Sequence, residues 1–319
     1  MLKSMRLVFL STIFFFLTLG SEAKIEIKKI KSKNIELIKF QSPDSRYPGK
    51  DDIVAEIHFP KNMSGKLPVV IVQHGSNRDT MKFKKWGGKS DEFSKRIAQR
   101  GIQEGYAVAV IDSFYKKGIS PGDKKKFPNA AMFLIKLKKI LSEDPRFDEN
   151  RFFLTGFSFG GGNVNKFYDE RTQRKLKIPW KAMVAAEPAC QTVSYPMKIT
   201  TPNLFIKGEE SHYPVKPCKY YAKIIKEQGN NIEFLIIPKV NHFFSFNGTI
   251  VKGIAVNGCP DNIAFRYPDG SWKFADGTPS TRRKVNKRCL GDKAGSGKTR
   301  EKLDLAVDYT YNFFNKHKN

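Results

Sequence analysis

The feature that most constrains this chain is a serine between glycines, placed where a strand-like run gives way to a helical pattern. The motif reads Gly-Phe-Ser-Phe-Gly over residues 156–160, and two further glycines follow it directly. The run at 152–155 predicts a strand that enters the motif, and the segment 158–169 predicts a helix that leaves it. A serine at the tip of so tight a turn requires small neighbours, and the helix N-terminus favours negative charge that develops there. We therefore predict that Ser158 is a nucleophile; the alternative is a glycine-rich turn without chemistry.

Short β-branched or aromatic runs alternate with longer segments of helical spacing along most of the chain. This alternation is typical of a mostly parallel sheet covered by helices, an α/β fold. A chain of 319 residues with 40% hydrophobic content can bury the core that such a sheet needs. The predicted strands are 35–40, 53–59, 69–73, 107–111, 152–155, 182–186, 204–206 and 233–237, and the predicted helices are 91–104, 130–141, 158–169, 216–228 and 302–315.

A nucleophilic serine needs a general base, and the chain offers five histidines. His242 comes just after the last predicted core strand and well before the final helix, which is where the base follows in the order serine, acid, histidine. His58 falls within a predicted strand and His317 lies near the end of the chain, so both fit this order less well. We predict that His242 is the base; the alternative is a loop histidine satisfied by local hydrogen bonds.

The base needs a carboxylate that orients it, and this acid should follow a strand of the sheet. The predicted strand 204–206 is followed by two adjacent acids, Glu209 and Glu210. Glu187, which closes the predicted strand 182–186, is a third candidate. Adjacent glutamates in a basic protein can also be plain surface charge, so the residues alone leave the acid open.

The reaction also needs amide donors for the negative oxygen of its intermediate. The predicted strand 69–73 ends in His74, Gly75 and Ser76, the place where such a fold supplies one backbone N–H. We predict that the backbone amides of Ser76 and Phe159 form this oxyanion hole, and that His74 and Gly75 shape the loop.

These segments together resemble a known family. The run Val-Gln-His-Gly-Ser at 72–76, the segments 106–114 and 148–152, and Asn241-His242-Phe243 look like the dienelactone-hydrolase-like branch of the α/β-hydrolases. The likeness covers about residues 52–244 and the last helix. It implies an α/β-hydrolase fold and a hydrolase. Members named for dienelactone cleavage carry cysteine at the nucleophile position, so Ser158 points to serine esterase chemistry.

The same resemblance decides between the candidate acids. Relatives carry an aspartate in a Gly-Glu-x-Asp-like segment, and aligning Pro214 and Cys218 with them puts Glu210 in that place. The resemblance therefore implies a triad of Ser158, His242 and Glu210, with Glu209 and Glu187 as reserves.

The N-terminus predicts export. Residues 1–6 include Lys3 and Arg6, an apolar run covers 7–19, and small residues precede a cleavage point after Ala23. The alternative, a membrane anchor, needs a longer apolar run of about 20 residues. We predict a signal peptide over 1–23, a single domain over 24–319, and a secreted or periplasmic protein without a transmembrane anchor after processing.

Export makes disulfides the expected state of the four cysteines. Three pairings are possible, and we favour Cys190 with Cys218 and Cys259 with Cys289; the alternative is free buried thiols. The second pair would close the segment 247–298, which interrupts the alternation and predicts a cap-like irregular insertion. Within that segment, Asp-Gly pairs at 269–270 and 276–277 predict two successive turns.

The formal net charge of +26 bears on partners and not on the fold. Lysines are spread along the chain and seldom alternate with aromatics, which favours a solvated basic surface over a specific nucleic-acid site. Residues 295–299 resemble the end of a phosphate-binding loop, but Asp292 stands where its first glycine belongs and no predicted strand precedes it. We predict no cofactor and no metal site.

Together these features predict an exported serine hydrolase that cleaves a carboxylic ester or related acyl bond through an acyl-enzyme. Its substrate would be a small or polymer-linked ester, and the charge favours an anionic one. The alternatives are a serine peptidase, a carbohydrate-ester esterase, and a non-catalytic exported binding protein that holds an anionic polymer on a hydrolase scaffold.

Overall fold

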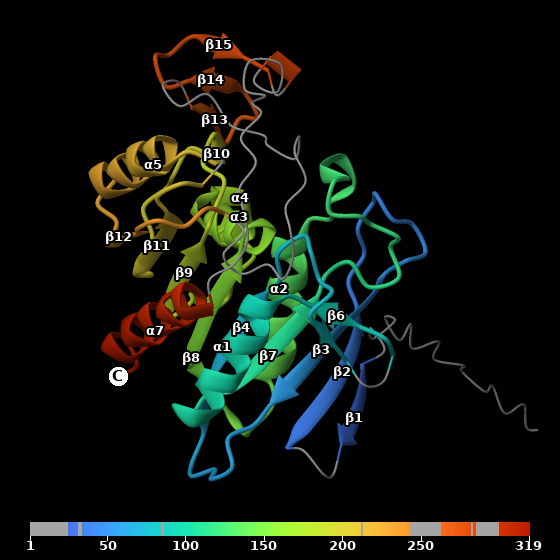
Figure 1. The fold of residues 1–319 in the computed structure, drawn as a ribbon. Coiled ribbons are helices and arrows are strands. Elements are labelled where there is room, and N and C mark those ends of the chain that lie inside the picture. The colour runs from blue at the N-terminus through green and yellow to red at the C-terminus, as the bar shows by residue number, and fades with distance from the viewer. Residues whose placement is uncertain are drawn as a thin grey trace, which may run out of the picture.

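A computed structural model describes residues 25–30, 34–83, 86–211, 213–242, 263–281, 283–284 and 300–319. In this part of the chain nine strands form a central sheet in the order β1-β2-β3-β7-β4-β8-β9-β11-β12 (Figure 1). The six strands from β7 to β12 are parallel to their neighbours, while β1, β2, β3 and β7 pair antiparallel. The sheet is therefore mostly parallel, with an antiparallel edge.

The elements have the following bounds. The strands of the central sheet are β1 (Glu26–Ile30), β2 (Ile35–Gln41), β3 (Asp52–His58), β4 (Leu67–Gln73), β7 (Ala107–Asp112), β8 (Phe147–Phe157), β9 (Ala182–Ala186), β11 (Asn203–Gly208) and β12 (Ile232–Ile237). The helices are α1 (Glu92–Gln103), α2 (Ala130–Ser142), α3 (Phe159–Asn165), α4 (Glu170–Gln173), α5 (Val215–Glu227) and α7 (Arg300–Lys316), with short 3₁₀ turns η1 (Lys124–Lys126) and η2 (Lys166–Tyr168). A two-residue pair, β5 (Met81–Lys82) and β6 (Lys89–Ser90), lies outside the main sheet.

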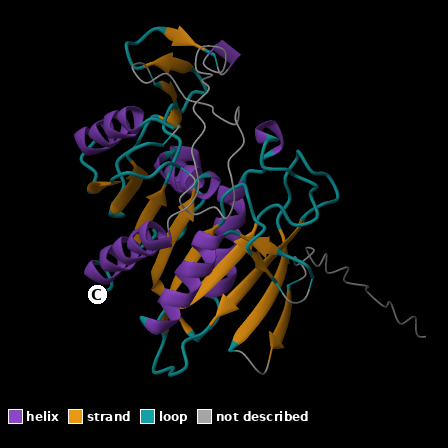
Figure 2. Cartoon of the chain, viewed as in Figure 1, coloured by secondary structure: helices purple, strands orange, loops and turns teal. Residues whose placement is uncertain are grey.

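Helices cover both faces of the sheet (Figure 2). The side chains of each parallel strand alternate between two cores: in β4, Val69 and Ile71 pack with α2, α3 and α5, whereas Val70 and Val72 pack with α1 and α7. Strands buried on both faces read as continuous apolar runs, which is why β4 and β7 are among the clearest strands in the sequence. The two cores fix the parallel strands and hence the loops at their carboxyl ends.

A second, small sheet lies at the top of Figure 1. Strand β10 (Thr192–Ser194) pairs with β13 (Ala264–Arg266), which continues into β14 (Trp272–Phe274) and β15 (Pro279–Ser280). The two predicted Asp-Gly turns are confirmed, because Gly270 and Gly277 adopt positive φ where β13, β14 and β15 reverse. The described part of the predicted insertion therefore forms strands, and β13 joins them to β10.

All eight predicted strands of the central sheet and all five predicted helices are present. The largest difference follows the serine motif, where one predicted helix is divided into α3, η2 and α4. Strand β1 and the strands of the small sheet were not predicted, since each is short and depends on a partner distant in sequence. The predicted signal peptide, Cys259 and Cys289 lie outside the described residues.

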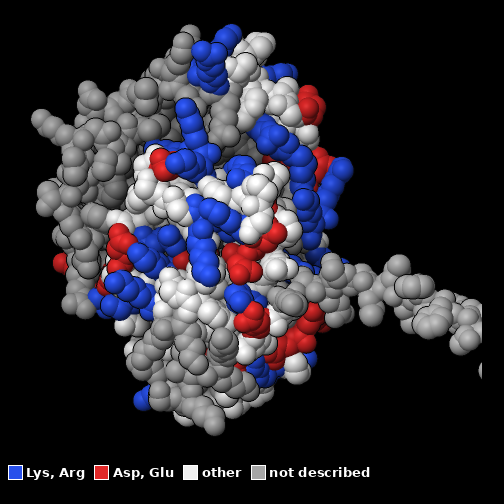
Figure 3. Space-filling model, turned by 90° about the vertical axis from the view of Figure 1, so that its right-hand side faces the viewer, with Lys and Arg blue, Asp and Glu red and all other residues white. Residues whose placement is uncertain are grey.

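Two properties of the exterior bear on partners. No helix within the described ranges is long and apolar enough to cross a membrane. In the view of Figure 3, Lys and Arg side chains lie across the described part of one face and acidic side chains stand among them.

Candidate active site

Ser158 lies at the sharp turn between β8 and α3. Its φ is 54° and its ψ is −107°, in the positive-φ region that non-glycine residues rarely occupy. Two backbone hydrogen bonds hold the turn: the Ser158 N–H donates to the Ala186 carbonyl at 2.9 Å, and its carbonyl accepts from the Gly162 N–H at 2.8 Å. Such strain at one residue is found where the surrounding structure fixes it, commonly at a functional site.

The glycines of the motif are required by close backbone approaches. A Cβ on Gly156 would lie 2.6 Å from the Gly160 backbone, and one on Gly161 would lie 2.5 Å from the Ala186 carbonyl oxygen. A Cβ on Gly160 would collide with the carbonyl oxygen of Gln73 at the end of β4. The glycines therefore let the turn pack closely against the ends of β4 and β9, with Ser158 at its tip.

His242 follows β12 and lies directly beside Ser158. The hydroxyl Oγ of Ser158 is 2.7 Å from His242 Nε2. The other ring nitrogen, Nδ1, is 2.8 Å from Oε2 of Glu187. Because an ionised carboxylate can only accept, Nδ1 carries the proton and Nε2 carries the lone pair that can accept the proton of the serine. The structure thus brings together a hydroxyl, an imidazole in the tautomer of a general base, and a carboxylate.

Glu187 stands directly after β9, the strand next to β8. Like Ser158 it has a positive φ, of 51°, and its N–H donates to the Ile206 carbonyl at 2.7 Å. Its side chain is fully buried. The adjacent strands β8 and β9 are therefore each followed by a residue with positive φ, and the side chains of both residues contact His242.

The structure does not bring Glu210, the acid that the resemblance implies, to His242. The residue is exposed, and its N–H donates to the Val240 carbonyl in the turn after β11. Glu209 is also exposed, and its carboxylate accepts from the Lys239 N–H at 3.0 Å. The third candidate, Glu187, is the carboxylate on His242.

The reason for this difference is structural. At the end of β11, Gly208 directs its N–H at Oε1 of Glu187, so the chain there presents donors to the acid and no carboxylate. The next residue with a side chain in the site is Ser211, whose Oγ donates to Oε2 at 2.8 Å. Local likeness to relatives favoured the loop after β11, whereas the carboxylate comes from the strand beside it.

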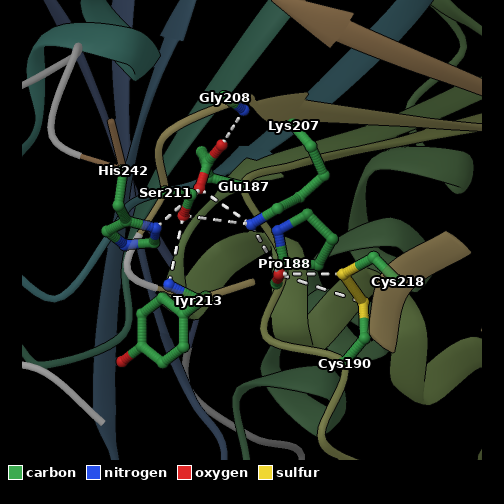
Figure 4. The surroundings of a disulfide bond; sticks show 9 residues. All are labelled: Glu187, Pro188, Cys190, Lys207, Gly208, Ser211, Tyr213, Cys218 and His242. Atoms are coloured by element: carbon green, nitrogen blue, oxygen red, sulfur yellow. Dashed lines mark hydrogen bonds and ion pairs between the residues drawn. A yellow bond between two sulfur atoms is a disulfide. The ribbon is translucent and has the colours of Figure 1, made fainter. Parts of the chain in front are cut away.

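A buried lysine completes the surroundings of this carboxylate (Figure 4). Nζ of Lys207 lies 2.9 Å from Oε2 of Glu187, and both side chains are fully buried. Burial alone would raise the pKa of Glu187, but the charge of Lys207 and the hydrogen bonds from His242 and Gly208 outweigh it and hold the pKa at about 2. These contacts therefore stabilise the ionised form of the carboxylate.

Burial also governs His242. Loss of water lowers the pKa of the imidazole below 6.5, although the hydrogen bond to Glu187 opposes this change. The positive charges of Lys207 and Lys124 lower the pKa further. The ring of Tyr213 packs edge-on against the imidazole, with centroids 4.7 Å apart. His242 is consequently neutral and able to accept a proton at neutral pH.

The loop after β4 fixes the other side of the site. His74 is fully buried: its Nδ1–H donates to the Gly75 carbonyl and its Nε2 accepts from the Ser113 N–H at 3.0 Å. Burial lowers the pKa of His74 to about 3, so it is neutral and structural. The N–H of Gly75 is taken by Asp91, and Ser76, the next residue, is half-buried. Phe159 opens α3, where the first amides have no partner within the helix.

The predicted disulfide between Cys190 and Cys218 is confirmed. It joins the chain three residues after Glu187 to the first turn of α5. Both sulfurs lie near the Pro188 carbonyl oxygen, at 3.9 Å from Cys190 and 3.4 Å from Cys218. The disulfide therefore closes residues 190–218, which include Lys207 and Ser211, and fixes the chain just after Glu187.

The sequence did not indicate three further residues of the site, Lys207, Ser211 and Tyr213. The one available signal was a lysine inside a strand that is otherwise apolar, since an unpaired lysine there would be costly. Within the described ranges, no cluster of three or more His, Cys, Asp or Glu side chains could hold a metal ion.

Comparison with known proteins agrees with the fold and with the class of protein that the site defines, an α/β-hydrolase. The family model of the dienelactone hydrolase family matches residues 53–255, and the chain belongs to this family of hydrolases. A Salmonella typhi protein described as a candidate carboxymethylenebutenolidase is 23% identical over 212 residues, which cover 61% of this chain and 74% of that protein.

Two solved structures illustrate the structural likeness. A dienelactone-hydrolase-like promiscuous phosphotriesterase from metagenomic libraries superposes with a TM-score of 0.55 at 14% identity, over 90% of this chain and all of that one. A candidate dienelactone hydrolase from Klebsiella pneumoniae superposes with a TM-score of 0.48 at 19% identity, over 66% of this chain and 88% of that one. At 14% identity, the likeness to the first of these structures bears on the fold alone.

Proposed function

We propose that this protein is a serine esterase that works through an acyl-enzyme, with Ser158 as nucleophile, His242 as general base and Glu187 as the orienting acid. The observation that carries the proposal is the continuous chain from Ser158 Oγ to His242 Nε2, 2.7 Å, and from Nδ1 to Glu187 Oε2, 2.8 Å. Membership of the dienelactone hydrolase family supports a hydrolase, and Ser158 is the residue at the turn where a nucleophile is exposed.

In the proposed reaction His242 Nε2 takes the proton of Ser158 as Oγ attacks the carbonyl carbon of the ester. The C=O double bond opens to an oxyanion, which the amides of Ser76 and Phe159 stabilise, each contributing about 3 kcal/mol. The oxyanion then re-forms the carbonyl, the C–O bond to the alcohol breaks, and the imidazolium returns its proton to that alcohol. Water, deprotonated by His242, releases the acid in the same way.

A panel of p-nitrophenyl esters from acetate to decanoate tests the proposal and defines acyl length. We expect turnover of at least one member by the wild-type protein, and a loss of about 10⁴-fold or more in Ser158→Ala and in His242→Ala. Ser94→Ala is a matched control, because Ser94 is a buried serine in α1 and its removal should leave turnover unchanged. Turnover that survives in Ser158→Ala would contradict the proposal.

We further propose that the protein is exported and acts on an ester outside the cytoplasm, with an anionic ester favoured by the charge of +26. The Cys190–Cys218 disulfide supports an oxidising compartment. N-terminal sequencing of the protein recovered from the medium or periplasm should begin at Lys24. A chain that stays in the cytoplasm with residues 1–23 attached would contradict export.

A further inference from the structure

Lys207 is a fully buried lysine whose ammonium faces the acid of the site. Its Nζ lies 2.9 Å from Glu187 Oε2, 3.3 Å from the Pro188 carbonyl oxygen and 3.3 Å from Ser211 Oγ (Figure 4). The three N–H donors of the ammonium group are thus matched by one charged acceptor and two neutral acceptors. The lysine is therefore held in a single place, on the far side of the carboxylate from His242.

A gain in the stability of the fold does not explain this buried ion pair. Two charges in a dry interior lose their hydration, and replacing such a pair with apolar side chains of similar volume is often neutral or stabilising. The site proposed above gives a reason, because the oxygen that Lys207 contacts, Oε2 of Glu187, is the one that accepts from His242 Nδ1.

We propose that Lys207 is a positioning residue of the catalytic triad, which keeps the Glu187 carboxylate ionised and turned toward His242. This inference rests on the proposed function. The two groups on either side of Oε2 have different tasks: His242 exchanges the proton with the serine, and Lys207 fixes the oxygen against which the imidazole is oriented.

The charges of the cluster give a consequence that can be measured. Glu187 and His242 share their first proton as a coupled pair, so the pH at which activity is lost belongs to the pair. A positive charge 2.9 Å from the carboxylate makes that first proton bind less readily, whichever group receives it. Lys207 therefore lowers the pH at which the pair takes up this proton, and His242 can act as a base down to that lower pH.

The remaining groups around the pair do not replace this charge. Lys124 also lowers the pKa of His242, but its ammonium is bound at 2.8 Å to the Tyr213 hydroxyl. The Cys190–Cys218 disulfide lies against the Pro188 carbonyl that Lys207 also contacts. Lys124 and the disulfide stay unchanged when Lys207 alone is substituted.

The test is the pH dependence of covalent labelling of Ser158 by a fluorophosphonate, which needs no knowledge of the natural ester. In Lys207→Met we expect the acid limb of the second-order labelling rate to move up by about 1 to 2 pH units. On the acid limb, well below the wild-type midpoint, the rate should fall about 10- to 100-fold, since each unit is a factor of ten, and at pH 9 it should stay within roughly threefold of wild type.

Two control variants separate charge from damage. Lys207→Arg keeps the positive charge, and its acid limb should stay within about 0.5 pH unit of wild type. Lys138→Met removes another buried lysine, one that donates to the carbonyls of Ile178 and Pro179 away from the site. Its acid limb should not move, although its stability can fall.

A rate for Lys207→Met that is reduced by the same factor at every pH would overturn the inference, as would an unchanged acid limb. A measurement on the wild-type protein remains decisive should that variant not fold: the Lys207 Nζ resonance must be that of an ammonium at pH 7, and a neutral amine would overturn the inference. Labelling that is absent, or that persists in Ser158→Ala, would instead refute the proposed function.

Discussion

Replacing Glu187 by glutamine should abolish most of the activity, and the contacts of the Glu187 carboxylate explain why the loss should be large. The Glu187 carboxylate accepts from His242 Nδ1 at Oε2 and from the Gly208 N–H at Oε1. A glutamine amide has one acceptor and one donor group. If its oxygen faces His242, its NH₂ opposes the Gly208 N–H; if its NH₂ faces His242, the imidazole must present a bare Nδ1 and lose the lone pair at Nε2.

The second arrangement is the wrong tautomer for a base, and in a serine protease that error costs about 10⁴ in kcat. A factor of 10⁴ corresponds to about 5.5 kcal/mol of transition-state stabilisation, at 1.36 kcal/mol for each factor of ten. The substitution also leaves Lys207 without its anion, which should lower the free energy of unfolding by roughly 3 to 5 kcal/mol.

The assay is kcat for the best p-nitrophenyl ester, measured beside thermal unfolding so that unfolded protein is not counted as inactive enzyme. Glu210→Gln is the matched control: this exposed carboxylate should change kcat by less than about twofold. A Glu187→Gln variant within tenfold of wild type, together with a large loss in Glu210→Gln, would refute the assignment and restore the acid expected from the sequence.

Three further predictions concern the turn, the base and the disulfide. Gly160→Ala should destabilise the protein by about 3 kcal/mol or more, because the new methyl group meets the Gln73 carbonyl oxygen; chemical denaturation measures this, and a loss under 1 kcal/mol would contradict it. Since burial lowers the pKa of His242, kcat/KM should be constant through neutral pH and fall only below pH 6.5; a midpoint above 7 in the pH profile would be inconsistent with this. Replacing Cys190 and Cys218 by serine opens a link across 28 residues, worth about 3.5 kcal/mol in the chain-entropy model, and an unchanged Tm would oppose it.

Local patterns were sufficient for the parts of the site that depend on one segment. The strand, the glycines and the helix around Ser158 are contiguous, and each glycine is required by a backbone contact of the turn itself. His242 was identified because it follows β12, the last strand of the central sheet. Such features can be read from order and spacing along the chain.

The acid could not be read in this way, because its position depends on which neighbouring strand end faces the histidine. Glu187 after β9 and Glu210 after β11 both follow strands of the same sheet, and both are followed by proline within four residues. What separates them is the positive φ of Glu187 and its three donors, Lys207, Gly208 and Ser211, which come from the next strand and its loop. Those contacts exist only in the folded chain.

The most direct test of the central claim is the mass of the intact protein after reaction with a fluorophosphonate, followed by peptide mapping. We expect one phosphonyl group per chain, carried by Ser158 on the peptide that contains the Gly-Phe-Ser-Phe-Gly turn, and no labelling of Ser158→Ala. A group on any other residue, or equal labelling of wild type and Ser158→Ala, would contradict Ser158 as the nucleophile and with it the triad.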